Sequence, residues 1–81
     1  MHVRIRLFAR LRDLTGAAEL ERDLRDDSTA GDAWSALVRE FPGLADYTRS
    51  ISCAVNEEYA RMTTPLQTGD EVAFLPPVSG G

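Results

Sequence analysis

One stretch of the 81-residue sequence has the spacing of a long amphipathic helix. Between residues 30 and 41 the apolar side chains recur three or four positions apart, which gathers them into one stripe along a helix. The stripe consists of Ala30, Ala33, Trp34, Leu37, Val38 and Phe41. Thr29 and Asp32 form a variant of the capping box at its start, and Pro42-Gly43 is a stop signal at its end. A helix with a single apolar stripe must pack against another element, so we expect it to lie across a sheet.

The segments on either side of this helix alternate apolar and polar residues, which is the period of half-buried strands. The clearest case is the start of the chain, where Val3, Ile5 and Leu7 alternate with arginines. We predict strands at Val3–Phe8, Glu19–Leu24, Ile51–Val55, near Tyr59 and at Glu71–Leu75, with a short helix from Ala9 to Gly16. This order predicts an α+β roll, with a mixed sheet of about five strands, one main helix and one short helix. If the first and last strands are adjacent and parallel, the long helix can serve as the crossover between them.

The composition argues against a membrane protein, an exported protein and a nucleic-acid-binding protein. No apolar run approaches the ~20 residues that cross a bilayer, and the alternating start of the chain does not resemble a signal peptide. We therefore expect a cytoplasmic protein that does not bind membranes. The net charge is −4, with nine basic residues scattered among thirteen acidic ones, and this argues against nucleic-acid binding.

Few side chains in the sequence are suited to catalysis or metal binding. Cys53 is in phase with Ile51 and Val55, so we interpret it as a buried apolar residue rather than a redox site. It has no companion ligand at zinc spacing, and His2 has no clustered partner and is expected in solvent. We therefore predict no metal site. All nine basic residues are arginine, so no lysine side chain is available for an isopeptide bond.

The most informative segment follows the last predicted strand and reads Pro76-Pro77-Val78-Ser79-Gly80-Gly81. The two prolines favour a stiff, extended exit, and the two glycines leave the end of the chain without side chains. We therefore divide the chain into a β-sheet domain, 1–75, and a flexible projecting tail, 76–81. The simplest alternative is a frayed terminus. A carboxylate at Gly81 becomes an acyl donor only after activation, normally as an acyl-adenylate made from ATP.

Three segments together resemble MoaD, the small, sulfur-carrying subunit of molybdopterin synthase in the ubiquitin-like MoaD/ThiS family. They are the ending from Gly69 to Gly81, the segment Ala54-Val55-Asn56, and Phe8-Ala9-Arg10-Leu11-Arg12. The resemblance implies a β-grasp fold. It also implies that a MoeB-like enzyme adenylates Gly81 with ATP and converts it to a thiocarboxylate, with Gly80 as its steric partner. It implies no permanently bound cofactor, and it makes this chain a carrier rather than an enzyme.

The same resemblance implies a second partner, a MoaE-like large subunit that forms a heterotetramer with this chain. The tail would enter the active site of that subunit and give its sulfur to cyclic pyranopterin monophosphate. The general acids, bases and pterin-binding cations would then belong to the large subunit, so a shortage of catalytic side chains here agrees with the resemblance.

Strand parity also predicts a surface for such partners. If Val3, Ile5 and Leu7 face the core, Phe8 faces outward, and Leu75 does so by the same argument. The predicted docking surface consists of Phe8, Tyr59, Leu75, Pro76 and Pro77, continued into the tail by Val78 and Ser79. The alternative is that Phe8 packs under the short helix and Tyr59 covers a loop.

Three other functions remain open at this point. One is another sulfur carrier, either ThiS-like for thiamine or one serving cysteine synthesis or tRNA thiolation. The predicted helix Phe8–Gly16 and the Pro-Pro-Val-Ser-Gly-Gly ending favour the molybdopterin branch over it. The second is a ubiquitin-like modifier that joins Gly81 to a lysine of a target protein. The third is an interaction module with an inert tail.

Overall fold

The structure is a computed structural model and describes residues 1–77. It contains every predicted strand and both predicted helices, within one or two residues of the predicted ends. The elements are β1 (His2–Leu7), α1 (Ala9–Thr15), β2 (Glu19–Asp23), α2 (Ala30–Glu40), η1 (Pro42–Tyr47), β3 (Ser52–Val55), β4 (Glu58–Ala60) and β5 (Glu71–Leu75). The 3₁₀ helix η1 was not predicted. Pro42 does end α2, but a proline is also tolerated in the first turn of a new helix, where its missing N–H is not needed.

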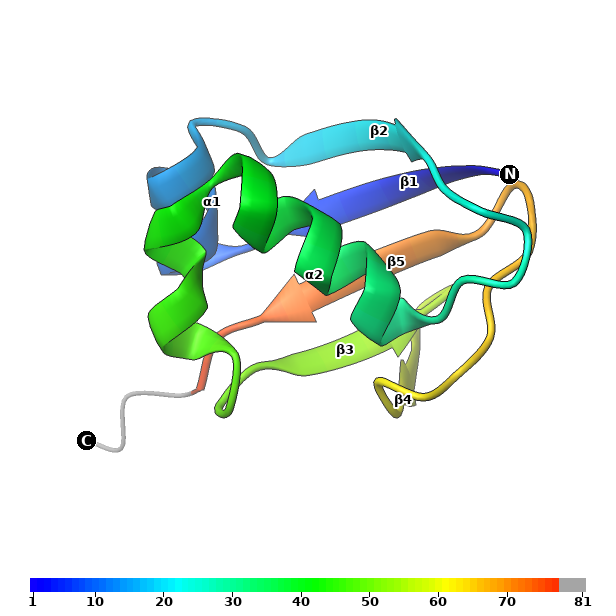
Figure 1. Cartoon of the computed structure of the whole chain (residues 1–81). Helices are drawn as coiled ribbons and strands as arrows, with labels where there is room; N and C mark the ends of the chain where they lie inside the picture. The colour runs from blue at the N-terminus through cyan, green and yellow to red at the C-terminus, as the bar shows by residue number, and fades with distance from the viewer. Residues whose placement is uncertain (78–81) are drawn as a thin grey trace.

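The five strands form one mixed sheet in the order β2-β1-β5-β3-β4 (Figure 1). Strands β1 and β5 are parallel neighbours, with Ile5 opposite Val72 and Leu7 opposite Phe74. The other three strand pairs are antiparallel. The first and last strands are thus adjacent and parallel, an arrangement that the sequence left open, and the predicted α+β roll is confirmed.

Helix α2 lies across one face of this sheet and covers the core (Figure 1). Its Trp34 side chain is 2% exposed and its ring lies 5.1 Å, centroid to centroid, from the ring of Phe74 on β5. The indole N–H donates to Thr48 Oγ1 at 3.1 Å, so its polar atom is satisfied. Leu11 of α1 and Leu44 of η1 are also fully buried and belong to the same core.

Local signals fix where the helices begin and end. The predicted capping box is present, because Asp32 N–H donates to Thr29 Oγ1 at 3.2 Å and Thr29 N–H donates to Asp32 Oδ2 at 2.9 Å. Helix α1 ends at Gly16, whose φ of +75° allows its N–H to reach Arg12 O at 2.8 Å. Within residues 1–77, no helix has both the length and the apolar character needed to cross a membrane.

Candidate functional site

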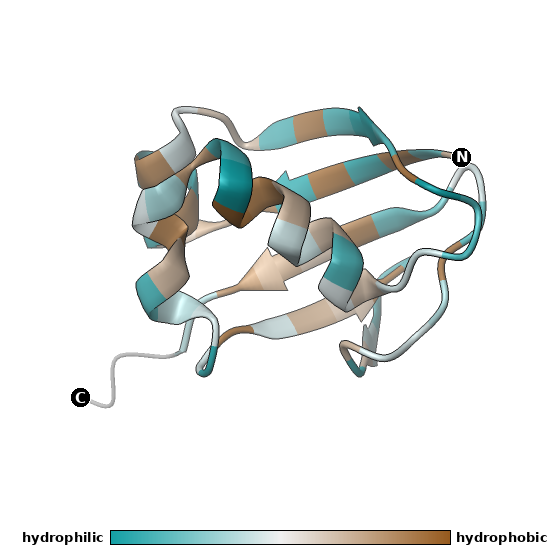
Figure 2. Ribbon diagram, in the orientation of Figure 1, coloured by the Kyte–Doolittle hydropathy of each residue, from teal (hydrophilic) through white to brown (hydrophobic). Residues whose placement is uncertain are grey.

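The two faces of the sheet differ in what covers them. The residues that face α2 are apolar, and those on the opposite, open face are mixed, which appears in Figure 2 as alternating brown and teal bands along the strands. The strand register aligns Arg6, Ala73, Ala54 and Tyr59 in one row across four strands of the open face. The two alanines lie in the middle of this row. Because their side chains are small, the surface of the open face is indented there.

A shallow depression of about 230 Å³ therefore lies on the open face, which we call the open-face hollow. It is lined by Arg6, Phe8, Ala54, Glu57, Tyr59, Glu71, Ala73 and Leu75. Three of these are the large apolar residues that the sequence predicted to face outward, namely Phe8, Tyr59 and Leu75. The structure thus brings them together around one concave surface.

Phe8 forms the wall of the open-face hollow at the end of β1. It is 36% exposed, and the Arg6 guanidinium carbon lies 5.2 Å from the centroid of its ring, at the distance of a cation–π contact. The next residue, Ala9, has φ of +52°, and this left-handed residue redirects the chain into α1. Phe8 therefore does not pack under the short helix as the alternative reading supposed.

Tyr59 forms the opposite wall and is 82% exposed. It lies on β4, one residue after Glu58, which pairs with Val55 across a two-residue turn. Asn56 and Glu57 in this turn both have positive φ, of 52° and 71°, as the tight turn of a hairpin requires.

The side chain of Asn56 fixes this hairpin to the start of β5. Its Nδ2 donates to Asp70 Oδ1 at 3.0 Å, and its Oδ1 accepts from the backbone N–H of Glu71 at 3.0 Å. Its own backbone N–H donates to Glu71 O at 2.8 Å. We did not predict this role of Asn56 from the sequence. The only signal was an asparagine at a turn, a residue that tolerates the left-handed region and bonds to nearby backbone.

Charged groups border the apolar part of the hollow. The Glu71 carboxylate lies 4.0 Å from the guanidinium groups of both Arg4 and Arg6, and Glu57 adds a second acid at the turn. Exposed pairs at this distance contribute little to stability. They do give the hollow a polar rim, which is the usual anatomy of a protein–protein contact.

The tail leaves the sheet beside this hollow. Because β1 and β5 are parallel, they end at the same edge of the sheet, and Leu75 is followed there by the half-buried Pro76 and the exposed Pro77. Figure 1 shows the chain leaving at that edge. Val78, Ser79, Gly80 and Gly81 lie outside the described residues, so their predicted roles stay predictions.

Two other predicted residues have clear surroundings. Cys53 is 2% exposed, its thiol donates to Ala60 O at 3.3 Å, and burial raises its pKa, so its interpretation as a buried residue is confirmed. His2 is exposed, as expected, but the expectation that it has no partner is wrong. Its Nδ1 lies 2.8 Å from Asp23 Oδ1 and its Nε2 lies 2.6 Å from Glu21 Oε1.

The partners of His2 come from the neighbouring strand β2, where register places Asp23 directly opposite it. The hydrogen bond that the ring donates to the Glu21 carboxylate, and then the one to Asp23, raise the pKa of His2. The two ring nitrogens bond to different carboxylates on opposite sides of the ring, so the three side chains do not converge on one metal ion. The cluster is therefore a cross-strand ion pair.

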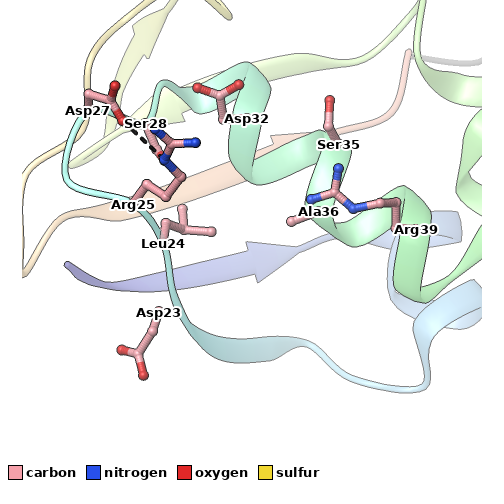
Figure 3. Close-up of a pocket in the computed structure, with 9 residues that line it drawn as sticks. All are labelled: Asp23, Leu24, Arg25, Asp27, Ser28, Asp32, Ser35, Ala36 and Arg39. Carbon is pink, nitrogen blue, oxygen red and sulfur yellow. Dashed lines mark ion pairs between the residues drawn. The ribbon is translucent and has the colours of Figure 1, made fainter.

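A second hollow, of about 450 Å³, lies between α2 and the segment that follows β2 (Figure 3). It is lined by Asp23, Leu24, Arg25, Asp27, Ser28, Asp32, Ser35, Ala36 and Arg39. Its charges have both signs, and the closest drawn pair joins Arg25 to Asp27 at 3.8 Å. The segment after β2 is at the edge of the sheet opposite to the one where β5 ends (Figure 1). The hollow beside the tail is therefore the stronger candidate.

Comparisons with known proteins show what the chain as a whole is similar to. The profile described as the ThiS family matches residues 5–81. The molybdopterin synthase sulfur carrier subunit of Arabidopsis thaliana is 37% identical over 81 residues, which cover 100% of this chain and 84% of the relative. The crystal structure of SAMP1 from Haloferax volcanii, named a small archaeal modifier protein, has a TM-score of 0.86 and 34% identity, with 100% of both chains covered.

A further similarity is to a chain in an assembly. A complex of subunits 1 and 2 of molybdopterin-converting factor from Helicobacter pylori contains a chain with a TM-score of 0.70 and 27% identity, again with 100% of both chains covered. These likenesses confirm the predicted β-grasp fold, and they all belong to proteins with a similar length.

Proposed function

Because the chain belongs to the ThiS family, we propose that it is a sulfur carrier whose working group is the carboxylate of Gly81. The observation that carries this proposal is the position of the tail. The chain leaves the sheet at Leu75, through the half-buried Pro76 and the exposed Pro77, beside the open-face hollow. A partner seated on the hollow would have its active site within reach of the tail, since six extended residues span roughly 20 Å.

The proposed chemistry has two steps. In the first, the Gly81 carboxylate attacks the α-phosphate of ATP on a MoeB-like enzyme, forming an acyl-adenylate and releasing pyrophosphate. In the second, a hydrosulfide ion from a sulfur donor attacks the acyl carbon, the C–O bond to AMP breaks and AMP leaves, and loss of the S–H proton gives the thiocarboxylate. ATP is consumed by that enzyme, so this chain needs no bound cofactor.

The tail residues suit such a reaction. Prolines at 76 and 77 fix φ and hold the chain extended, which lowers the entropy lost when it enters a channel. Glycines at 80 and 81 carry no side chain, so enzyme groups can approach the backbone and the acyl carbon closely. The prolines therefore stiffen the part of the tail next to the sheet, and the glycines leave its end accessible to an enzyme.

We further propose that the carrier serves molybdopterin synthesis. Support comes from the Arabidopsis thaliana relative, by its name a molybdopterin synthase sulfur carrier subunit, and from the Helicobacter pylori complex of two subunits. In this proposal a MoaE-like large subunit docks on the open-face hollow and forms a heterotetramer with this chain. Sulfur then passes from Gly81 to cyclic pyranopterin monophosphate.

A second candidate function is protein modification, and one observation favours it. The chain is 34% identical to SAMP1 of Haloferax volcanii, whose name is that of a modifier. A modifier would end as an amide on a lysine of a target protein, whereas a carrier would return with a free carboxylate. Stable conjugates in cell extracts, detected with an antibody to this chain, would favour modification.

The proposal is tested by sulfur loading. We expect incubation with ATP, a MoeB-like enzyme and a sulfur donor to raise the intact mass by the difference between sulfur and oxygen. Deletion of Gly81 should abolish the increase, while Arg25→Ala, in the second hollow, should leave it unchanged. A loaded protein that yields no dithiolene product with MoaE and the pterin precursor would refute the molybdopterin branch but not the carrier. No mass increase in the unaltered chain would refute both.

A further inference from the structure

The basic side chains of this protein share one chemical property. All nine are arginine, and the 81 residues include no lysine. A guanidinium group remains protonated at neutral pH and has no free electron pair, whereas a lysine amine acylates readily once it loses its proton. The chain thus keeps its cationic surface without a side-chain amine.

The α-amino group of Met1 is the remaining primary amine of the sequence, and the fold engages it. It donates to the backbone oxygen of Leu24 at 2.7 Å and to Asp26 Oδ1 at 3.0 Å. The Met1 side chain is 4% exposed and packs against the core. The two hydrogen bonds and the buried side chain fix the nitrogen in place, so an activated acyl group would have to reach it there. The amine also lies where β1 begins, at the sheet edge opposite to the end of β5 (Figure 1).

The other strong nucleophiles among the described residues are engaged as well. The Cys53 thiol is buried, donates to Ala60 O and has a raised pKa, so little thiolate forms. Both ring nitrogens of His2 bond to carboxylates, those of Asp23 and Glu21. Hydroxyl groups such as that of Tyr59 are weak nucleophiles unless a neighbouring base activates them.

From these observations we propose that the chain is inert toward its own activated carboxyl group, so that the acyl group of Gly81 passes only to a nucleophile from another kind of molecule. The inference rests on the proposed function, because only activation of Gly81 creates the hazard. In the avoided reaction an amine attacks the acyl carbon, a C–N bond forms, the bond to AMP or to a thiol breaks, and the amine loses a proton to solvent. The product would be a cyclic monomer or an amide-linked dimer, and either would remove a carrier permanently.

The test uses the full chain with an alkyl thioester placed chemically at Gly81, so that no activating enzyme is needed. The concentrated protein is kept at mildly alkaline pH, and intact mass spectrometry separates the hydrolysed monomer from cyclic and dimeric amides. We expect the unaltered chain to hydrolyse. Arg10→Lys, which adds an exposed amine on α1 and preserves the charge, should form roughly ten times more amide product.

Arg10→Gln is the matched control, because it changes the same side chain without adding an amine and should behave like the unaltered chain. Asp26→Asn, at a 96% exposed side chain, removes the ion pair with Met1 and should increase acylation at Met1 a few-fold. The inference is overturned if the unaltered chain forms as much amide as Arg10→Lys, or if Arg10→Lys forms none. Because the thioester is made chemically, this result is independent of whether the sulfur-loading experiment succeeds.

Discussion

The two faces of the sheet are built from alternate residues of the same strands and have different tasks. On the covered face, Val3, Ile5, Val72 and Phe74 are fully buried under Trp34. On the open face, the same strands present arginines, acids, alanines and a few exposed apolar residues. Successive side chains of a strand point to opposite faces, so one face stabilises the fold while the other is free to bind a partner. Substitutions at two neighbouring residues of one strand can therefore compare the two faces.

The largest expected effect lies on the covered face. Phe74→Ala removes a fully buried ring from the contact with Trp34 and should lower the free energy of unfolding by about 3–5 kcal/mol. The matched variant is the next residue, Leu75→Ala, which faces the open side and should lower it by only about 1 kcal/mol. Urea denaturation followed by tryptophan fluorescence measures both. If both variants lost the same free energy of unfolding, the two faces would not differ in their contribution to stability.

A larger side chain in the open-face hollow should change partner binding strongly and the free energy of unfolding only slightly. Ala73→Gln places a polar side chain at its centre and should weaken binding of the large subunit by about 2 kcal/mol, roughly thirtyfold, with little change in stability. Ala36→Gln makes the same exchange in the second hollow and serves as the control. Titration calorimetry with a MoaE-like protein gives both affinities. If Ala36→Gln weakens binding more, the partner uses the other surface.

A substitution in the turn beside Tyr59 should have a smaller effect, and it should stabilise the protein instead of destabilising it. Glu57 has φ of +71°, a conformation that disfavours residues with a Cβ, so Glu57→Gly should raise the free energy of unfolding by about 1 kcal/mol. Glu58→Gly, one residue later in β4, should instead lower it by roughly 0.5–1 kcal/mol, because glycine weakens a strand. If Glu57→Gly does not raise the free energy of unfolding, the positive φ of Glu57 carries no strain.

The smallest expected effect is a pH dependence from the charged half of the open face. The pKa of His2 is raised above its ordinary value of 6.5 by Glu21 and Asp23, so with rising pH this pairing keeps its full contribution to stability up to pH 6.5. The contribution is lost as the pH rises through the folded-state pKa. Since the pKa of Glu21 is lowered by His2, the pairing also weakens in acid, below the ordinary value of 4.5.

The pH dependence is measured by thermal denaturation at closely spaced pH values. His2→Gln keeps a hydrogen-bonding side chain but cannot titrate, so it should flatten the decline between weakly acidic and alkaline pH. An identical decline in the variant would assign the pH dependence to other groups.

Local patterns in the sequence were sufficient for most of the fold. The alternation at residues 71–75 predicted β5 with its observed ends, and Thr29 with Asp32 predicted the start of α2, because strand period and capping are properties of adjacent residues. Burial of Trp34 and Cys53 followed from the same periodicity. The 3₁₀ helix η1 was missed because a proline that stops one helix can also begin another.

The site was predictable only in part, since its shape depends on strand register. Parity placed Phe8 and Leu75 outside, but the hollow between them exists because Ala54 and Ala73 meet from strands far apart in sequence. The partners of His2 lie on β2, and no local pattern reveals which residue of one strand is opposite another. A single sequence does not show which residues of two strands lie opposite each other, and the hollow depends on that register.

The central claim is that the terminal carboxylate of Gly81 is the group that carries sulfur. The most direct measurement uses the full chain with Gly81 converted to a carboxamide, incubated with ATP, a MoeB-like enzyme and a sulfur donor beside the free acid. We expect the free acid to gain the mass difference between sulfur and oxygen and the amide to gain nothing. Equal mass gain in both proteins would contradict it, because the sulfur would then have to reside elsewhere on the chain.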